Sequence, residues 1–550
     1  MKIRIGTRGS DLALWQANYV ADLLRQAGCE VDITVLKTRG DRIDDVPLNS
    51  LEGKGFFTAE IERALLKYDV DLAVHSHKDL PFDGPSGLFI VAVPRRASPA
   101  ERLLIHPAAH DPDGLLLPLK EGVNIGTSAP RRSEQLTALR PDLKVSMLRG
   151  NVPTRLKRLQ EGRYDAIVLA SAGIDRLQLD LEGLVDHRLS PEIFVPAPAQ
   201  GALAIQIREG EDELAEICRR SLDDGKTAPI IQAERALLKK LGGGCSLPLG
   251  VLMEELDGPE STPTTRWWAH AFLGENYPRA GQPSRWVSTV AATLDEAADK
   301  LLEELETDER PFTGGPLGGL RLALAGSGAR DGWLARRLRT LGASLGIEKV
   351  IATEPLNNAD LAEYLGRLAE GDMIAFTSAR AAELMQGFRP AKGIRIAAVG
   401  PSTAEALEAC GWTPTVVGTG GARDLAHALD IPAGTRVLFP CAKNARTDLE
   451  EELSKRGIEV LRRAVYHTVT LSDVALNSSV DYRIYTSPTA VEACTLWERE
   501  HEDLPTVRIP LGEATREAMR QAGLAAMDGE IAGPQDVLRR LIEINRKEKR

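Results

Sequence analysis

The amino-acid sequence predicts an α/β protein in two halves. The first half has two wound α/β lobes plus a small α+β domain, and the second is a bilobal α/β unit. Three observations predict this. Short β-branched runs alternate with amphipathic helices over residues 1–210, a linker rich in glycine and proline occupies residues 307–319, and residues 320–550 contain an internal repeat. The 550 residues suffice for roughly three to five domains.

Residues 1–210 supply the alternating elements. The predicted strands are Lys2–Ile5, Val31–Leu36, Asp71–His75, Phe89–Val93, Asn124–Gly126, Lys144–Leu148 and Asp165–Leu169, and the predicted helices are Leu12–Ala27, Thr58–Tyr68, Ser133–Leu139 and Val152–Glu161. This order is typical of sheets wound with helices. The number of strands fits two lobes better than one sheet.

Residues 211–306 predict the small α+β domain. The predicted elements are a helix at Ile230–Leu241, apolar stretches at Leu247–Met253, Thr265–Phe272 and Arg285–Val290, and a helix at Leu294–Leu305. Cys245 lies before the first stretch, directly after three glycines. Such an open backbone lets a group approach the sulfur, whereas a packing cysteine lies among bulky apolar side chains. We interpret Cys245 as the attachment point of a covalently held group. The alternative is a glycine-rich turn with a bystander thiol.

The second half follows the linker Thr307–Gly319, which lacks the preceding strand and following Lys-Ser/Thr of a nucleotide loop. The internal repeat of this half has two copies, Gly400-x-x-Thr403-x-x-Ala406-Leu407-x-x-x-Gly411 and Gly512-x-x-Thr515-x-x-Ala518-Met519-x-x-x-Gly523. Each copy follows a predicted strand that ends in a Thr-Ser pair, Phe376-Thr-Ser378 in the first and Tyr485-Thr-Ser487 in the second. We expect two similar lobes that face each other across a cleft, with hydroxyls and helix N-termini available to carboxylates. Plain helix capping is the alternative for either Thr-Ser pair.

The composition excludes several classes of protein. The net charge of −11 argues against bulk nucleic-acid binding, and the chain has no run of 18 apolar residues that would predict a membrane span. The first residues lack the apolar core of a signal peptide, and six scattered cysteines fit neither a disulfide framework nor a zinc site. We therefore expect a cytoplasmic protein. Between Arg131 and Arg176, ten Lys/Arg stand against five Asp/Glu, which predicts a small anionic ligand.

Lys78 and Asp79 follow a predicted buried strand in Val74-His-Ser-His-Lys-Asp-Leu-Pro-Phe82. Ligand sites of open α/β sheets lie at the carboxyl ends of strands. Lys78 is thus a candidate to bind an anion, and Asp79 to stabilise a developing cation or to transfer a proton. A surface ion pair fits the local sequence equally well. The His75-x-His77 pair has no evident third ligand, so no metal site is predicted.

Arginines are expected on several separate loops. Arg8 and Ser10 follow the first strand, Lys54 lies in Gly53-Lys-Gly-Phe-Phe57, and the other segments are Thr127-Ser-Ala-Pro-Arg-Arg132, Arg149-Gly-Asn-Val-Pro-Thr-Arg155 and Gly173-Ile-Asp-Arg176. Arginine holds carboxylates in bidentate pairs, so converging loops of this kind predict a ligand with several carboxylates. For any single arginine, an ordinary surface position is the alternative.

Residues 1–306 resemble the porphobilinogen deaminase (hydroxymethylbilane synthase) family. The resemblance runs through Arg4-Ile-Gly-Thr-Arg-Gly-Ser-Asp-Leu-Ala-Leu-Trp-Gln-Ala17, His75-Ser-His-Lys-Asp79, Gly126-Thr-Ser-Ala-Pro-Arg-Arg132, Pro198-Ala-Gln-Gly201 and Gly243-Gly-Cys245. It implies that Cys245 holds a dipyrromethane cofactor, itself made from substrate, through a thioether. Four porphobilinogen units would extend this cofactor. Each loses ammonia to give an azafulvene, whose positive charge the catalytic Asp79 would stabilise.

The same resemblance implies the binding residues and the domains. Cofactor carboxylates would meet Ser10, Lys78, Arg131 and Arg132, and substrate carboxylates would meet Arg8, Arg149, Arg155 and Arg176. Ala59 stands where many members have a lysine, so that contact would be absent or replaced. The implied domains are 1–96 with 197–213 returning to it, 97–196, and 214–306, which carries the cofactor cysteine.

Residues 320–550 are similar to uroporphyrinogen-III synthases. The similarity rests on Phe376-Thr-Ser378, Ala398-Val-Gly400 with Thr403, Leu438-Phe-Pro440 with Arg446, Val465-Tyr466 and Tyr485-Thr-Ser-Pro488. It implies one lobe of 320–353 plus 468–550 and another of 354–467. Tyr466 would assist loss of the hydroxyl from the linear tetrapyrrole, and Ser378, Thr403 and Thr486 would hydrogen-bond its carboxylates. A half-buried aromatic near the hinge is the alternative for Tyr466.

Together the resemblances imply a bifunctional, monomeric enzyme. It would convert four porphobilinogen to hydroxymethylbilane and then, with inversion of ring D, to uroporphyrinogen III. The free bilane closes spontaneously to the wrong isomer, so tethering is expected to raise the second enzyme's effective concentration at the release site. Two alternatives stay open: a deaminase with a non-catalytic C-terminal lobe pair, and a bilobal small-anion-binding protein.

Overall fold

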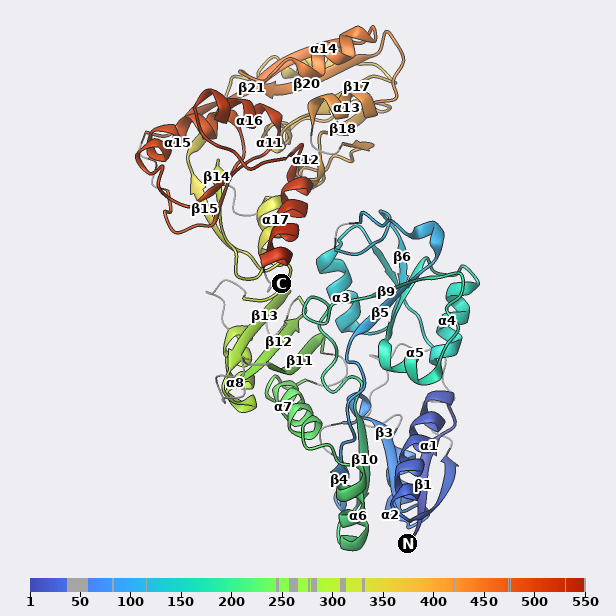
Figure 1. Cartoon of the computed structure of the whole chain (residues 1–550). Helices are drawn as coiled ribbons and strands as arrows, with labels where there is room; N and C mark the ends of the chain where they lie inside the picture. Colours follow the sequence, from blue (N-terminus) through green and yellow to red (C-terminus); the bar gives the residue numbers. More distant parts are fainter. Residues whose placement is uncertain are drawn as a thin grey trace. The chain divides into compact units, whose positions relative to one another are not determined.

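The computed structural model (Figure 1) describes residues 1–36, 58–81, 84–114, 116–243, 247–256, 266–275, 277, 284–306, 313–328, 332–418, 421–472, 474, 476–529 and 531–548. The chain forms two compact units, one of residues 1–318 with 340–342 and one of residues 319–339 with 343–550. Both combine helices with sheets, which confirms the predicted α/β class. Within the described ranges, no helix is long and apolar enough to cross a membrane.

The first sheet of the N-terminal unit has five strands in the order β2-β1-β3-β10-β4. The strands are β1 (Lys2–Arg8), β2 (Glu30–Leu36), β3 (Leu72–Ser76), β4 (Leu88–Ala92) and β10 (Leu203–Arg208), and the helices are α1 (Asp11–Gln26), α2 (Ala59–Leu66) and α6 (Asp212–Leu222). β1 to β3 run parallel, whereas β10 is antiparallel to β3 and β4. Helix α1 buries Ala17, Val20, Ala21 and Leu24, the spacing of one helical face, against the sheet.

The second sheet has the order β7-β6-β8-β5-β9. Its strands are β5 (Glu101–Ile105), β6 (Asn124–Gly126), β7 (Lys144–Ser146), β8 (Ala166–Ala170) and β9 (Val185–Arg188), with helices α3 (Pro130–Leu139), α4 (Val152–Gln160) and α5 (Ser171–Leu177). The chain enters this sheet after β4 and returns to the first sheet at β10. The two crossing segments touch where Ala97 N donates to Gly201 O at 3.2 Å. Gly201 has φ +87°, and a Cβ there would lie 2.5 Å from Ala97 O, so this crossing requires glycine.

The third sheet of this unit is antiparallel. It consists of β11 (Leu249–Leu256), β12 (Arg266–Leu273) and β13 (Arg285–Ala291), covered by α7 (Thr227–Lys240) and α8 (Leu294–Glu306). Leu237 of α7 and Leu301 of α8 are fully buried in its core. Helix α7 leads to Leu241–Gly243, and the predicted attachment residue Cys245 lies outside the described residues.

The C-terminal unit holds two sheets. One is parallel, in the order β15-β14-β22-β23, with β14 (Arg321–Gly326), β15 (Ser344–Lys349), β22 (Tyr482–Tyr485), β23 (Val507–Pro510) and helices α9 (Trp333–Thr340), α15 (Pro488–Glu500), α16 (Glu513–Gln521) and α17 (Pro534–Glu548). Ile484 and Tyr485 of β22 are fully buried, as expected for a parallel strand covered on both faces.

The other sheet has the order β16-β21-β20-β17-β18-β19. Its elements are β16 (Ile351–Pro355), β17 (Met373–Phe376), β18 (Arg395–Ala398), β19 (Val416–Val417), β20 (Arg436–Ala442), β21 (Glu459–Thr470), α10 (Leu361–Gly366), α11 (Ala379–Leu384), α12 (Pro401–Ala409), α13 (Ala422–Ala428) and α14 (Asp448–Lys455). Only β16 runs antiparallel to its neighbour, β21. The repeat is visible as β17-α11-β18-α12 and β22-α15-β23-α16, each strand–helix–strand–helix.

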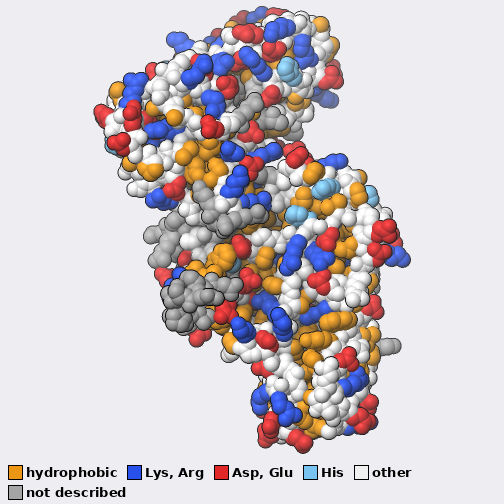
Figure 2. Space-filling view, viewed as in Figure 1, with side chains coloured by type: hydrophobic (Ala, Val, Ile, Leu, Met, Phe, Trp, Pro, Cys, Tyr) orange, Lys and Arg blue, Asp and Glu red, His pale blue; other side chains and the backbone are white. Residues whose placement is uncertain are grey.

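Charged side chains are interspersed over the visible faces of both units. Figure 2 shows small groups of Lys and Arg next to groups of Asp and Glu on this side of the molecule. The net charge of −11 is therefore not gathered into one acidic patch on this side.

Candidate functional site

The Lys78–Asp79 segment is a single 3-10 turn, His77–Asp79, at the carboxyl end of β3. Lys78 Nζ donates to Gln200 Oε1 at 3.2 Å, so the returning segment Pro198–Gly201 holds the lysine. Burial lowers the pKa of the Lys78 ammonium, while the neighbouring Asp79 carboxylate partly offsets this effect. Asp79 itself is exposed. The strand-end position predicted for these two residues is confirmed.

Arg131 and Arg132 occupy the first turn of α3, which begins at Pro130. The expectation that they lie in a loop before a helix starting at Ser133 was wrong. Proline is well tolerated at the first helical position, because its missing N–H has no intrahelical acceptor there. A helical backbone therefore starts earlier than the apolar periodicity indicates, and it places both arginines on a rigid element.

Both guanidinium groups meet one carboxylate, that of Glu101 at the start of β5. Arg132 Nε and Nη2 donate to Glu101 Oε1 and Oε2 at 3.0 and 2.7 Å, and Arg131 Nη2 also donates to Oε1. Arg131 Nη1 donates to Val195 O at 2.7 Å. Burial alone would raise the pKa of Glu101, but the charges of Arg132 and Arg131 outweigh it and hold the pKa well below its usual range. The carboxylate is thus a permanent anion.

Arg155 extends this basic group from α4. The Asn151 side chain caps the helix, and Arg155 Nε donates to Gly150 O at 2.7 Å. Burial, and then the charge of Arg132, lower the pKa of Arg155 to about 10, and Asp79 acts in the opposite direction. The positive charges of Arg149 and Arg158 also lower the pKa of Arg155. Arg155 therefore lies within electrostatic range of Asp79, Arg132 and Arg149, which come from other parts of the sequence.

The structure thus brings predicted cationic side chains together around the carboxylates of Asp79 and Glu101. They are Lys78, Arg131, Arg132, Arg149 and Arg155. A surplus of guanidinium donors is the chemistry that a ligand with several carboxylates requires. A dipyrromethane fits this donor set, because each of its pyrroles carries two carboxylates.

The remaining predicted residues of the N-terminal unit have other contacts. Ser10 caps α1, and its hydroxyl accepts from Ala13 N at 3.4 Å. Arg8 ends β1 and is partly exposed. The expectation of a loop at Arg176 was wrong, because Arg176 lies in the last turn of α5. Its Nη2 donates to Gly201 O at 2.8 Å, and its Cζ lies 5.4 Å from the Trp15 ring centroid. Arg176 thus contacts α1 and the returning segment.

Arg235 of α7 is a residue that sequence reasoning missed. It donates to the carbonyls of His77, Leu80 and Pro81 at 3.0, 3.1 and 3.0 Å. The helix that precedes Cys245 in the sequence therefore holds the turn with Lys78 and Asp79. Nothing in the helical run Ile230–Leu241 singles out this arginine, because its acceptors lie more than 150 positions away in the sequence.

In the C-terminal unit, the structure brings Tyr466 and Ser378 together. Tyr466 lies on β21, and its hydroxyl is 2.8 Å from Ser378 Oγ. Tyr466 is only 7% exposed and belongs to the hydrophobic core of this lobe, so a packing role remains the alternative. Burial raises the pKa of Tyr466, so the phenol keeps its proton at neutral pH.

The other predicted hydroxyls are placed separately. Ser378 also caps α11, with its Oγ accepting from Arg380 N at 3.2 Å, and Ser487 caps α15 in the same way. Capping is thus one role of both Thr-Ser pairs. Thr403 is buried in α12, and Thr486 Oγ1 donates to Ala325 O at 3.0 Å beside the other sheet.

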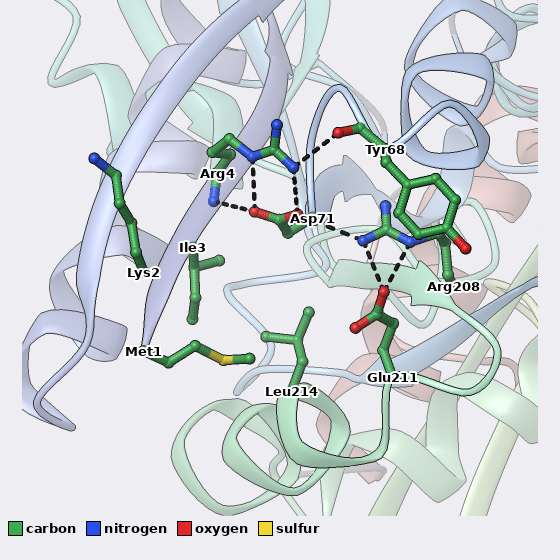
Figure 3. A pocket seen from close by; sticks show the side chains of 9 residues that line it. All are labelled: Met1, Lys2, Ile3, Arg4, Tyr68, Asp71, Arg208, Glu211 and Leu214. Atoms are coloured by element: carbon green, nitrogen blue, oxygen red, sulfur yellow. Dashed lines mark hydrogen bonds and ion pairs between the residues drawn. The ribbon is translucent and has the colours of Figure 1, made fainter.

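A cavity of about 360 Å³ lies elsewhere in the N-terminal unit, at the opposite end of β3 (Figure 3). Four of its charged groups, those of Arg4, Asp71, Arg208 and Glu211, pair with one another. Arg4 and Arg208 both donate to Asp71, and Arg208 also pairs with Glu211. None of the predicted site residues lines it. Across the described part of the chain, no group of three or more His, Cys, Asp and Glu side chains is placed to hold a metal ion.

Sequence families match both halves of the chain. Residues 3–216 match "Porphobilinogen deaminase, dipyromethane cofactor binding domain", residues 229–258 match "Porphobilinogen deaminase, C-terminal domain", and residues 333–527 match "Uroporphyrinogen-III synthase HemD". The porphobilinogen deaminase of Roseiflexus castenholzii is 46% identical over 252 residues, which cover 46% of this chain and 80% of the relative. That of Oceanobacillus iheyensis is 45% identical over 262 residues, covering 47% and 82%.

Solved structures similar to this chain include a mutant uroporphyrinogen III synthase from Thermus thermophilus, with a TM-score of 0.29 and 20% identity. The match covers 42% of this chain and 98% of that one. Uroporphyrinogen-III synthetase from Helicobacter pylori has a TM-score of 0.26 and 15% identity, covering 41% and 99%.

Proposed function

Because the chain belongs to the porphobilinogen deaminase family and carries a uroporphyrinogen-III synthase domain, we propose that its halves perform consecutive steps on one tetrapyrrole. The two activities are hydroxymethylbilane synthase and uroporphyrinogen-III synthase, and both belong to tetrapyrrole biosynthesis. In our proposal the first half joins four porphobilinogen, releases four ammonia and takes up one water, which supplies the hydroxyl of the bilane. The second half closes the linear hydroxymethylbilane with inversion of ring D and loss of water.

The N-terminal half contains the dipyrromethane cofactor binding domain. We propose that Cys245 holds the cofactor through a thioether and that Ser10, Lys78, Arg131 and Arg132 bind its carboxylates. When bound, the cofactor supplies the free pyrrole position at which the chain grows. The basic group around Glu101 supports this assignment, because three of the four proposed contacts belong to it.

Asp79 is the proposed catalytic residue of the deaminase. Loss of ammonia leaves positive charge on the porphobilinogen ring, and a fixed carboxylate stabilises that charge as it develops. The observation that carries this role is the grouping of the exposed Asp79 carboxylate with Arg132 and Arg155. Arg149 and Arg155 would bind the carboxylates of the incoming unit, with Arg8 and Arg176 as further substrate contacts.

In the second half, the Tyr466 phenol is proposed to donate a hydrogen bond to the departing hydroxyl of the bilane. Ser378 supports this role, because it lies within hydrogen-bond distance of the phenol oxygen. Ser378, Thr403 and Thr486 would hydrogen-bond substrate carboxylates. The substrate forms an azafulvene readily, so most of the work is to hold the conformation that inverts ring D.

Incubation with porphobilinogen, followed by isomer analysis, tests both halves at once. We expect uroporphyrinogen III, and an adduct of two pyrrole units on the denatured wild-type chain that Cys245→Ala lacks. Uroporphyrinogen I alone would mean that the C-terminal half is not catalytic. No consumption of porphobilinogen and no adduct would favour an anion-binding protein instead.

The benefit of the fusion needs its own comparison. We propose that tethering favours the III isomer because it raises the local concentration of the second enzyme. Separately expressed halves, mixed at equal concentration, should give more of the I isomer than the full chain, and an equal ratio would refute the benefit. We further propose a cytoplasmic monomer, which native mass and cell fractionation would check.

A further inference from the structure

The Glu101 carboxylate is a fully enclosed charge in the deaminase half, with a side chain that is 0% exposed. It accepts both Arg132 Nε at 3.0 Å and Arg132 Nη2 at 2.7 Å, and it also accepts Arg131 Nη2. One carboxylate thus joins the side chains of two consecutive residues.

This arrangement needs a physical cause, because consecutive residues of a helix point about 100° apart. Two adjacent guanidinium groups also repel each other, and the positive end of the helix dipole disfavours cations in the first turn of α3. A buried anion on the neighbouring strand removes both penalties. Glu101 therefore holds the Arg132 side chain, and it holds that of Arg131 together with Val195 O.

The hydrogen bonds to Glu101 also leave a defined set of donors on Arg132. A guanidinium group has five N–H donors arranged on two usable edges. Glu101 occupies the edge formed by Nε and Nη2. The other edge, Nη1 with the second N–H of Nη2, keeps the geometry for a bidentate pair with a carboxylate. Without Glu101, the Arg132 side chain would have to lose rotamer freedom when it binds a carboxylate.

We propose that Glu101 is a positioning residue that holds Arg131 and Arg132 so that the open edge of Arg132 meets a carboxylate of the dipyrromethane. The proposal rests on the proposed function of the N-terminal half. Glu101 acts on binding and not on the chemical step, because its carboxylate touches arginines and not the reacting atoms. Its loss should therefore weaken cofactor assembly and substrate affinity more than it slows turnover.

Two Glu101 variants and one matched control test this. Glu101→Gln keeps the shape and removes the charge, whereas Glu101→Asp keeps the charge on a shorter side chain. The control is Asp71→Asn, at the opposite end of β3 (Figure 3). Asp71 also holds two arginines, since it accepts from Arg4 at 3.0 and 2.8 Å and from Arg208 at 3.4 Å. It is not part of the proposed site.

The measurements on the full chain are the fraction of molecules that carry the two-pyrrole adduct, KM and kcat for porphobilinogen, and Tm. For Glu101→Gln we expect at least a tenfold lower adduct fraction. In the molecules that carry the adduct, KM should rise about tenfold while kcat changes less than about threefold. Glu101→Asp should lie between this variant and the wild type. Asp71→Asn should lower Tm without changing adduct fraction or KM.

Wild-type adduct fraction and KM in Glu101→Gln would overturn the proposal, as would the same profile in Glu101→Gln and Asp71→Asn. If Glu101→Gln does not fold, Glu101→Asp decides, and wild-type values for adduct and KM in that variant refute a positioning role. A wild-type chain without any adduct would instead refute the proposed function.

Discussion

Arg96 and Glu234 are joined by two parallel hydrogen bonds, from Nη1 to Oε1 at 2.8 Å and from Nη2 to Oε2 at 3.0 Å. The Glu234 side chain is 0% exposed, and its oxygens also accept the amides of Ala199 and Met253. One carboxylate of α7 therefore binds three parts of the chain: Arg96 in the segment that leaves the first sheet, Ala199 in the segment that returns to it, and Met253 of β11. This fixes α7, the helix that precedes Cys245 in the sequence, against both crossing segments.

Replacement of Glu234 by glutamine should lower the free energy of unfolding by about 3–5 kcal/mol, because it leaves the largely buried Arg96 guanidinium without its counter-charge. Denaturant unfolding of the full chain measures this. The matched control is Glu255→Gln, which removes an exposed ion pair with Lys226 on neighbouring elements and should change stability by less than about 1 kcal/mol. Equal unfolding midpoints for the two variants would contradict the role of the buried pair.

Replacement of Arg235 by lysine should reduce kcat/KM of the deaminase about tenfold. One ammonium group cannot reach the carbonyls of His77, Leu80 and Pro81 together, so the turn with Asp79 loses its fixed position. Steady-state kinetics with porphobilinogen measure the change. Lys239→Met, on an exposed position of the same helix, should keep the wild-type values. Wild-type kinetics in Arg235→Lys would show that the turn does not need this contact.

Local patterns were sufficient for part of the fold and not for the pairing of distant segments. Helix α1 was predictable, because its buried residues follow the spacing of one helical face. Strand β10 was not predicted, although Leu203–Arg208 is buried along its whole length. It inserts between β3 and β4 more than 100 positions away, and a short apolar run does not reveal such a partner.

In the candidate site of the N-terminal unit, too, local patterns were predictable and contacts between distant segments were not. Lys78 and Asp79 were predictable, because the carboxyl end of a buried strand is a general place for ligands. The role of Glu101 was not, because it depends on the first turn of α3 lying beside β5, and residues 101 and 131 are 30 positions apart. Sequence spacing could indicate which basic residues gather, but not which acidic residue holds them.

Acid should destabilise the N-terminal unit through its two buried histidines. His75 Nε2 lies 3.0 Å from Gln206 Oε1, and burial lowers the pKa of His75 from 6.5 to about 4 and that of His77 to about 3. Between pH 6.5 and 4 the unfolded chain binds a proton at His75 that the folded chain does not. The free energy of unfolding therefore falls as the pH falls through this window, by about 1.4 kcal/mol per pH unit for each histidine, and is independent of both histidines above it.

A variant without the His75 imidazole measures this contribution. His75→Gln should show a shallower loss of stability between pH 7 and 5 than the wild type, by roughly half of the slope that the two histidines supply. Denaturant midpoints at several pH values give both slopes. Parallel pH profiles for the variant and the wild type would contradict a neutral, buried His75.

Replacement of Tyr466 by phenylalanine should slow the synthase about 10- to 100-fold and leave porphobilinogen consumption unchanged. The change removes only the hydroxyl that lies 2.8 Å from Ser378 Oγ, and a hydrogen bond to a departing group is worth about 1–3 kcal/mol. The bilane would then close without the enzyme, so isomer analysis should show a higher share of uroporphyrinogen I. Since burial raises the pKa of Tyr466, the wild-type isomer ratio should not change between pH 7 and 9 through ionisation of this phenol.

Ser378→Ala, which keeps the Tyr466 phenol and removes the hydroxyl beside it, should have a smaller effect on the isomer ratio than Tyr466→Phe. If Tyr466→Phe gives the wild-type ratio while Ser378→Ala shifts it, the serine and not the tyrosine is the group that meets the substrate.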